Sequence, residues 1–316
     1  MLQVTDIRLD YGSLKKENRY RITENRNPVF TWAVISDGTN VTQKAFRVKV
    51  WSARKVLWDT GWREAGESEI TYAGEELPPE RRNYVSVCVR DSRGECSEDF
   101  TEYFFLSGLK ELELHWITSA EDKGNRALYF KKDFVCCKKV AHATIYACGL
   151  GYHEVYLNGR KTDRAVQDPA VSDYTRHCYV TVIPEAEELL KEQNCISAIV
   201  GQGWRRVGNE ASYYWEPIKF CGVPQLAMAL HVEYEDSSDE IIRTDDTWFC
   251  TEGPIIFSHL FDGETFDAGR VEPEWNQFGA VPAGDALARS VETPGGKLES
   301  MTLEPIIEQE EYPART

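Results

Sequence analysis

The carboxylates in residues 261–270 have the types and spacing that come nearest to acid–base chemistry in this chain. Asp262 and Glu264 stand two residues apart, and Asp267 follows. Inverting hydrolysis of a glycosidic bond uses one protonated and one ionised carboxyl group about 6.5–9.5 Å apart. Residues i and i+2 of a strand share one face at a separation of about 6.6 Å. The Asp-Gly step at 262 is foremost a turn signal, so we expect turn or interface carboxylates and no catalytic residue. Binding of Ca²⁺ by their oxygens is the alternative.

Aromatic residues beside charged ones are the second candidate, a sugar-binding surface. The flat ring of Trp or Tyr offers a large contact area at low entropic cost, which suits the apolar face of a sugar ring. The candidate carbohydrate-binding residues are Trp204, Arg205, Tyr214, Trp215 and Glu216, which follow a predicted strand. Packing in the core or at an interface is the alternative for Trp204 and Trp215.

Other chemistry-bearing patterns are missing. The nine cysteines form no C-x-x-C pair and the six histidines are scattered, so no zinc site is predicted. We expect the cysteines to be free thiols that act as small buried hydrophobes. Gly201-Gln-Gly203 lacks the third glycine and the following helix of a dinucleotide-binding loop.

The charge balance excludes two classes of partner. Lys plus Arg is 36 and Asp plus Glu is 52, so the net charge is 36 − 52 = −16. Nucleic-acid binders and proteins that dock on anionic membranes are basic where they bind, so neither partner is expected. No apolar stretch is long enough for a membrane helix, and the first twenty residues hold no apolar leader segment. A cytoplasmic location is therefore predicted.

Short alternating strands dominate the elements that must position these residues. Residues 1–108 carry about seven of them, among them Lys44–Trp51 and Asn83–Arg90, with a turn at Asp91–Gly94. This density is typical of an immunoglobulin-like sandwich, and the order of its motifs resembles fibronectin type III modules. An all-β fold is therefore predicted.

A second domain is predicted over residues 109–270. Its strands are longer, Asn158-Gly159 is a type I′ hairpin signal, and Pro184–Glu192 is the best helical stretch. Eight strands with one short helix indicate a jelly-roll sandwich resembling carbohydrate-binding modules. Residues 271–316 are irregular and are expected to be a tail that leads to an absent catalytic region.

Four segments carry a family resemblance. In order, Ala127–Phe134, Gly151–Gly159, Asn194–Trp204 and Phe261–Arg270, the last reading Phe-Asp-Gly-Glu-Thr-Phe-Asp-Ala-Gly-Arg, resemble the N-terminal region of bacterial α-L-rhamnosidases of glycoside hydrolase family 78. Three places depart from the family pattern: Asp168–Tyr174, Arg205–Val207 and the extra Gly269.

The resemblance implies an accessory role. Family members hydrolyse terminal α-L-rhamnosyl bonds with inversion, and their catalytic residues lie in an (α/α)6 barrel downstream of such sandwiches. The chain by itself is therefore expected to be inactive. Its expected partners are a rhamnose-containing glycan and the catalytic barrel of the same polypeptide. The corresponding module of some relatives binds rhamnose with calcium, so calcium is the one cofactor that the resemblance implies.

Two interpretations from other classes remain open. One is a free-standing carbohydrate-binding protein, and the other is a structural or dimerisation module that could form a homodimer. An exposed apolar patch along Phe257–Phe266 would favour a docking surface, whereas rhamnose binding by the isolated chain would favour the sugar-binding protein.

Overall fold

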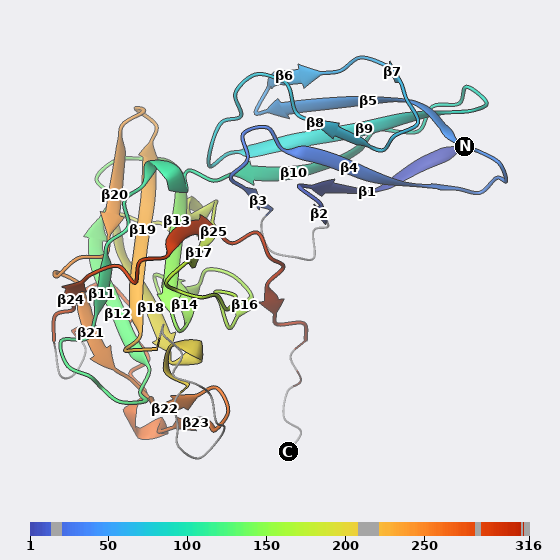
Figure 1. Cartoon of the computed structure of the whole chain (residues 1–316). Coiled ribbons are helices and arrows are strands. Elements are labelled where there is room, and N and C mark those ends of the chain that lie inside the picture. Colours follow the sequence, from blue (N-terminus) through green and yellow to red (C-terminus); the bar gives the residue numbers. More distant parts are fainter. Residues whose placement is uncertain (14–20, 208–220, 282–285, 311, 313–316) are drawn as a thin grey trace. The chain divides into compact units, whose positions relative to one another are not determined.

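The computed structural model describes residues 1–13, 21–207, 221–281, 286–310 and 312 (Figure 1). Two compact units are present: Met1–Glu111 with Thr302–Glu304, and Leu112–Met301 with the residues from Pro305 onward. The described residues form strands and a few short 3-10 turns, so the predicted all-β fold is confirmed. No helix in these ranges is long and apolar enough to cross a membrane.

The first unit is a sandwich of two sheets. One sheet has the order β2-β1-β4-β8, and the other has the order β3-β10-β9-β5-β6 with β7 paired to β5. The strands are β1 (Leu2–Leu9), β2 (Gly12–Ser13), β3 (Ile22–Thr23), β4 (Val29–Ser36), β5 (Gln43–Ser52), β6 (Lys55–Asp59), β7 (Arg63–Glu64), β8 (Glu69–Thr71), β9 (Arg82–Asp91) and β10 (Phe100–Leu106).

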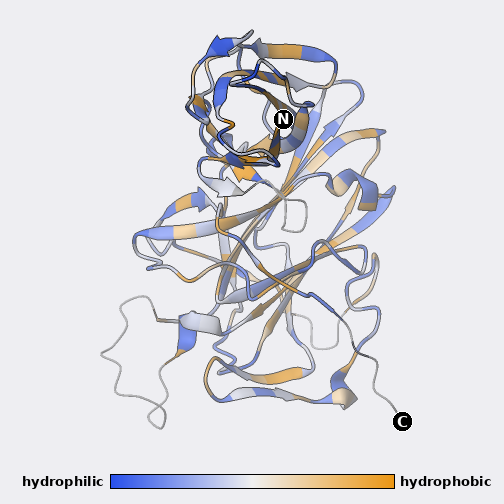
Figure 2. Ribbon diagram, turned by 90° about the vertical axis from the view of Figure 1, so that its right-hand side faces the viewer, coloured by the Kyte–Doolittle hydropathy of each residue, from blue (hydrophilic) through white to orange (hydrophobic). Residues whose placement is uncertain are grey.

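Alternation along these strands builds the core between the two sheets. Apolar and polar residues follow one another along the ribbons (Figure 2), and the apolar set of both sheets forms one buried cluster. Phe30 of β4 and Phe104 of β10 meet edge to face with ring centroids 5.6 Å apart. Trp32, 5% exposed, donates its indole N–H to Gln43 at 3.0 Å, so the one polar atom of this core residue is paired.

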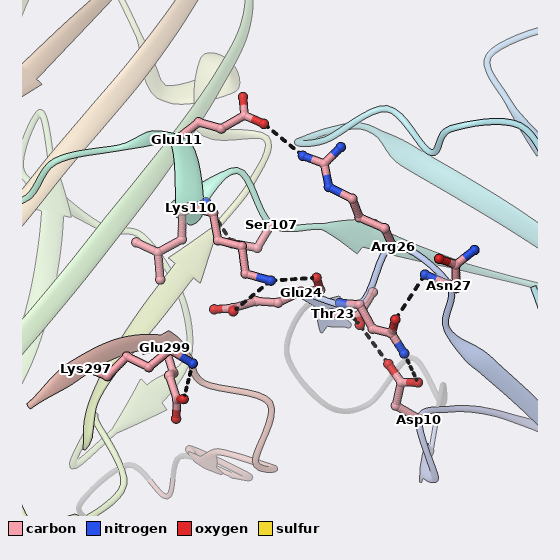
Figure 3. A network of polar contacts seen from close by, with 12 residues as sticks. Asp10, Thr23, Glu24, Arg26, Asn27, Ser107, Lys110, Glu111, Lys297 and Glu299 are labelled. Atoms are coloured by element: carbon pink, nitrogen blue, oxygen red, sulfur yellow. Dashed lines mark hydrogen bonds and ion pairs between the residues drawn. The ribbon is translucent and has the colours of Figure 1, made fainter. Parts of the chain in front are cut away.

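Polar contacts extend the first unit beyond the predicted boundary at 108. The 3-10 turn η1 (Leu109–Glu111) is fastened to the loop after β3 (Figure 3): Arg26 bonds Glu111 at 3.0 Å, and the ammonium of Lys110 lies 3.8 Å from the Glu24 carboxylate. Within the same network Asp10 accepts a hydrogen bond from the Thr23 hydroxyl at 2.7 Å. Residues 109–111 therefore group with the first unit.

The second unit contains two larger sheets. The first has the order β24-β11-β19-β13-β17-β25 with β20 paired to β19, and the second has the order β15-β14-β18-β12-β21. Their strands are β11 (Trp116–Thr118), β12 (Leu128–Val135), β13 (Val140–Leu150), β14 (Tyr152–Leu157), β15 (Arg160–Lys161), β17 (His177–Ile183), β18 (Gln193–Gly201), β19 (Gln225–Tyr234), β20 (Asp239–Arg243), β21 (Phe249–Glu252), β24 (Arg289–Val291) and β25 (Lys297–Ser300).

Two short ribbons and three 3-10 turns complete the second unit. β16 (Ala165–Val166) pairs with β26 (Ile306–Ile307), and β22 (Ile255–His259) pairs with β23 (Gly263–Phe266). The turns are η2 (Ala186–Leu189), η3 (Gly203–Arg206) and η4 (Ala268–Arg270). The helix expected near Pro184 is thus only the turn η2.

Local turn chemistry places the β14–β15 hairpin. Asn158 and Gly159 have φ of 52° and 79°, and Leu157 pairs with Arg160, which confirms the predicted two-residue turn. The amide of Asn158 also donates to the Leu189 carbonyl at 2.8 Å and to the Asn194 side chain at 2.9 Å. The turn is therefore held from inside the unit as well as by its own backbone.

The segment after residue 270 differs from the expected tail. It contributes strands to the second unit, because β24 pairs with β11 and β25 lies parallel to β17. Thr302–Glu304 groups with the first unit, and the chain then returns to the second. The Gly, Ala and Pro content of this segment did not indicate these strands, whose partners lie more than a hundred residues earlier.

Candidate functional site

A cleft of about 420 Å³ lies in the second unit, where β14 begins and β18 ends, beside the β22–β23 hairpin. Its polar lining includes Tyr152, Glu154, Gln167, Ser258, His259 and Glu264. A concave site with a few convergent polar groups is the default place to look for small-molecule binding.

The register of three strands creates one wall of the cleft. β18 pairs with both β12 and β14, with Tyr152 opposite Gly201 and Glu154 opposite Ile199. Gly151 has φ of 122°, and a Cβ there would lie 2.1 Å from the Gly201 carbonyl oxygen. Only glycine fits this approach. The glycines around residue 201 therefore serve close packing at the cleft.

The β22–β23 hairpin supplies the opposite wall. Ser258 pairs with Glu264, so the two side chains are cross-strand neighbours on one face. In the described ranges no hydrogen bond or ion pair joins the Glu264 carboxylate to another residue. Glu264 thus lines the cleft with a carboxylate that is unpaired within those ranges.

Asp262 does not lie on the strand face that its i, i+2 spacing with Glu264 implied. It belongs to the hairpin turn, where its N–H donates to the His259 ring at 3.1 Å and its carboxylate lies 3.0 Å from the same nitrogen. The expectation that Asp262 and Glu264 share one strand face is therefore wrong, because the strand begins only at Gly263. Asp262 is the turn carboxylate that the Asp-Gly step indicated.

Asp267 is also a turn carboxylate. It caps η4 by accepting the Gly269 N–H at 3.0 Å, and the Arg270 guanidinium lies 3.5 Å from it. The extra Gly269 of the sequence pattern lies inside this turn.

The second carboxylate of the cleft is Glu154 of β14. It accepts hydrogen bonds from the Tyr156 hydroxyl at 2.6 Å and from Lys161 at 2.8 Å. Burial raises the pKa of Tyr129 to about 12, and the charges of Glu264 and Glu154 add to that rise. Both carboxylates therefore act on one buried tyrosine from two different strands.

Trp204 lies beside the cleft in η3, next to the lining residue Gly203. Its ring meets Phe261 edge to face at 6.0 Å. Burial raises the pKa of Tyr152, and the neighbouring Trp204 opposes the rise. Phe261, in the hairpin turn, is 43% exposed, and Phe266, which pairs with Ile255 at the other end of the hairpin, is 55% exposed. A docking surface along Phe257–Phe266 stays a prediction.

Arg205 is 9% exposed and lies outside the cleft lining. Its Nε donates to the Val223 carbonyl at 3.1 Å, and its own carbonyl accepts the Gly222 N–H at 2.8 Å. Burial lowers the pKa of its guanidinium. Arg205 therefore helps to hold residues 222–223, and its contact with sugar stays a prediction. The other three candidates, Tyr214, Trp215 and Glu216, lie outside the described residues.

Of the residues singled out from the sequence, Glu264 lines the cleft and Trp204 lies next to the lining residue Gly203, whereas Tyr152, Glu154, Ser258 and His259 were not singled out. For Tyr152 and Glu154 the available signal was their i, i+2 spacing in a predicted strand; Ile255–His259 carries no such alternation. In the described ranges no three His, Cys, Asp or Glu side chains are grouped as metal ligands, so calcium binding stays a prediction.

Comparisons with known proteins show which protein families the chain resembles. A family model described as the α-L-rhamnosidase N-terminal domain matches residues 138–310, and one described as the Rha78A-like N-terminal immunoglobulin domain matches residues 13–111. The second match confirms the predicted immunoglobulin-like sandwich.

Several similar proteins are named α-L-rhamnosidase. An α-L-rhamnosidase of Formosa agariphila is 28% identical, over 86% of this chain and 32% of that protein. One of Streptomyces avermitilis is 32% identical over 142 residues, which cover 45% of this chain and 14% of that protein.

Solved structures agree in fold. The α-L-rhamnosidase from Dictyoglumus thermophilum has a TM-score of 0.79 at 27% identity, covering 94% of this chain and 35% of that one. The enzyme from Aspergillus terreus has a TM-score of 0.81 at 21% identity, which shows the fold alone. The chain spans about a third of the length of these proteins. Since the first family model matches more than half of the residues, the chain belongs to the α-L-rhamnosidase N-terminal domain family.

Proposed function

We propose that this chain is the accessory front portion of an α-L-rhamnosidase and that the cleft of its second unit binds the rhamnose-containing glycan. The observation that carries the proposal is the convergence of polar groups from two walls, with Ser258 and Glu264 facing Tyr152 and Glu154. Sugar hydroxyls need such a set of donors and acceptors, since a site built to pair them discriminates against ligands that lack them.

The aromatic edge of the cleft supports a ligand with an apolar side. Trp204 and Phe261 meet edge to face beside the cleft, whose lining includes Tyr152. Rhamnose carries a methyl group on its ring, and aromatic side chains give such groups a large contact area. Two exposed aromatic side chains of the hairpin, Phe261 in its turn and Phe266 at the other end of β23, support a second part of the role, which is packing against the catalytic barrel of the same polypeptide.

Binding is tested by titrating the whole chain with L-rhamnose and methyl α-L-rhamnoside, with and without Ca²⁺, and following chemical shifts or tryptophan fluorescence. Glu264→Gln should weaken binding by about ten-fold or more, because hydrogen bonds to an ionised acceptor are the strong ones. Glu188→Gln on η2, an exposed glutamate outside the cleft lining, is the matched control. No saturable response, or equal affinities for the two variants, contradicts the proposal.

Catalysis is tested separately with a chromogenic α-L-rhamnoside. The chain is expected to show no turnover, since Glu154 is held by Tyr156 and Lys161 and the family resemblance puts the acid and base in another module. If the chain hydrolyses the substrate and Glu264→Gln abolishes that turnover, the expectation of an inactive chain is contradicted.

A further inference from the structure

The side chains that line the cleft of the second unit bring negative charge and no fixed positive charge. Within the described residues, the lining includes the carboxylates of Glu154 and Glu264 and no lysine or arginine. The other titratable lining side chains are Tyr152, His153 and His259. A ligand that enters the cleft therefore meets two carboxylates, one from each wall.

The charge of Glu154 is only partly balanced. Its carboxylate lies 2.8 Å from the Lys161 ammonium, and the same ammonium lies 3.3 Å from the Glu308 carboxylate. One cation is thus shared by two anions. The guanidinium of Arg126, next to the lining in sequence, lies 3.3 Å from Glu252. These cations are therefore already paired with carboxylates of the chain.

Glu264 carries a charge that no cation of the described chain offsets. Its carboxylate makes no hydrogen bond or ion pair in those ranges, and its cross-strand neighbour is the uncharged Ser258. The fields of Glu264 and Glu154 meet at Tyr129, where both charges add to the rise in pKa that burial causes. The two carboxylates therefore act over the same region of the second unit.

We propose that Glu264 makes the cleft selective for neutral sugars and excludes saccharides that carry a carboxylate. The inference rests on the proposed function, because it names the class of sugar that the cleft accepts. The hydroxyl groups of a neutral sugar donate hydrogen bonds to an ionised carboxylate. A uronate adds a like charge to a site whose lining offers no cation to pair with it. Such a repulsive element is a common source of specificity.

The expected discrimination is about ten-fold in affinity. Glu264 is exposed, so the repulsion is moderated by water but persists between like charges several ångströms apart. Salt screens it over a length of about 10 Å at 0.1 M, which is comparable to the width of a cleft of about 420 Å³. The two carboxylates need not touch, and high salt should reduce the discrimination.

The test compares two ligands that differ only at the charged group: a disaccharide of rhamnose and glucuronic acid, and its carboxyl-reduced form, in which a CH2OH group replaces the carboxylate. The whole chain is titrated with each and with methyl α-L-rhamnoside at slightly alkaline pH, where histidine rings are ordinarily uncharged. Chemical shifts report binding. At low salt the acid should bind about ten-fold more weakly than the reduced form, and at high salt the difference should shrink.

Variants assign the effect to Glu264. Glu264→Gln should weaken both disaccharides through the lost hydrogen bond, yet bring their affinities to within about two-fold of each other. Glu264→Lys should reverse the order, so that the acid binds more tightly. Glu188→Gln, an exposed glutamate outside the cleft lining, should keep the ten-fold difference. Circular dichroism checks that each variant is folded.

The outcomes separate this inference from the proposed function. Equal affinities of the parent chain for the acid and its reduced form overturn the inference and leave rhamnose binding intact. A discrimination that Glu264→Gln leaves unchanged also overturns it, because another group would then be responsible. If methyl α-L-rhamnoside and both disaccharides fail to bind, the proposed function is overturned and this inference with it.

Discussion

Replacing Lys131 with methionine tests how the segment after β23 is held on the second unit. Lys131 of β12 is fully buried, and its ammonium donates to the carbonyls of Gln277 at 3.1 Å and Ala280 at 2.5 Å. Asp133 lies 3.3 Å from the same ammonium and accepts the Gly279 N–H at 2.7 Å. The pair therefore fastens residues 277–280 onto β12.

Methionine keeps most of the volume and removes the charge and all three donors. Removal of one member of a buried ion pair costs about 3–5 kcal/mol. The Asp133 side chain as a whole is 29% exposed and its other oxygen keeps the Gly279 N–H, but the oxygen that faces Lys131 is buried, so we expect a cost of about 3 kcal/mol. For a unit of this size that corresponds to a fall in Tm of about 6–12 °C.

Calorimetry measures the change in Tm, and hydrogen exchange of the Gly279 amide measures local release. Lys132→Met, the next residue on the same strand, whose ammonium reaches the Thr247 hydroxyl at the surface, is the control and should cost less than about 1 kcal/mol. If the two variants lose the same stability, or Gly279 exchanges as in the parent, the reasoning from buried geometry is refuted.

Three further outcomes are expected. Asn158→Ala should cost about 3 kcal/mol in urea unfolding, because three partners of the Asn158 amide at 2.8–2.9 Å lose their hydrogen bonds; a loss under 1 kcal/mol contradicts this. The Arg47 guanidinium lowers the pKa of Asp59 to about 2, below its unfolded value of about 3.9, so the pair stabilises above pH 4 and its contribution is lost as the pH falls to 2. Arg47→Gln should therefore cost about 0.5 kcal/mol at pH 6 and nothing near pH 2, and a pH-independent difference argues against the pair. A thiol reagent should label three cysteines rapidly in the native protein and the remaining six only after unfolding, and a fourth fast thiol would contradict the burial pattern. The three exposed thiols are Cys96, Cys137 and Cys221.

Local signals in the sequence predicted much of the fold. The β14–β15 turn follows from Asn158-Gly159, two residue types that tolerate positive φ. The Asp-Gly step at 262 correctly indicated a turn, and the alternation of β5 and β9 indicated the sandwich. Each of these features depends on residues close together in the chain.

Predictions that depended on distant partners were less successful. The spacing of Asp262 and Glu264 suggested one strand face, but the ring of His259 turns the chain at Asp262. The contacts of Arg205, a sugar-binding candidate, with residues 222–223 could not be foreseen from the sequence around Trp204. The strand β25 was missed because its partner, β17, precedes it by about 120 residues.

The sequence by itself determined the all-β class, the immunoglobulin-like first unit, the main turns and the family. These follow from period-two alternation and turn chemistry, which act over a few residues. The tertiary structure alone decided that Tyr152, Glu154, Ser258 and Glu264 share one cleft. Alternation tells which face of a strand a side chain occupies, whereas the choice of neighbouring strand comes from burial and backbone pairing between segments about a hundred residues apart.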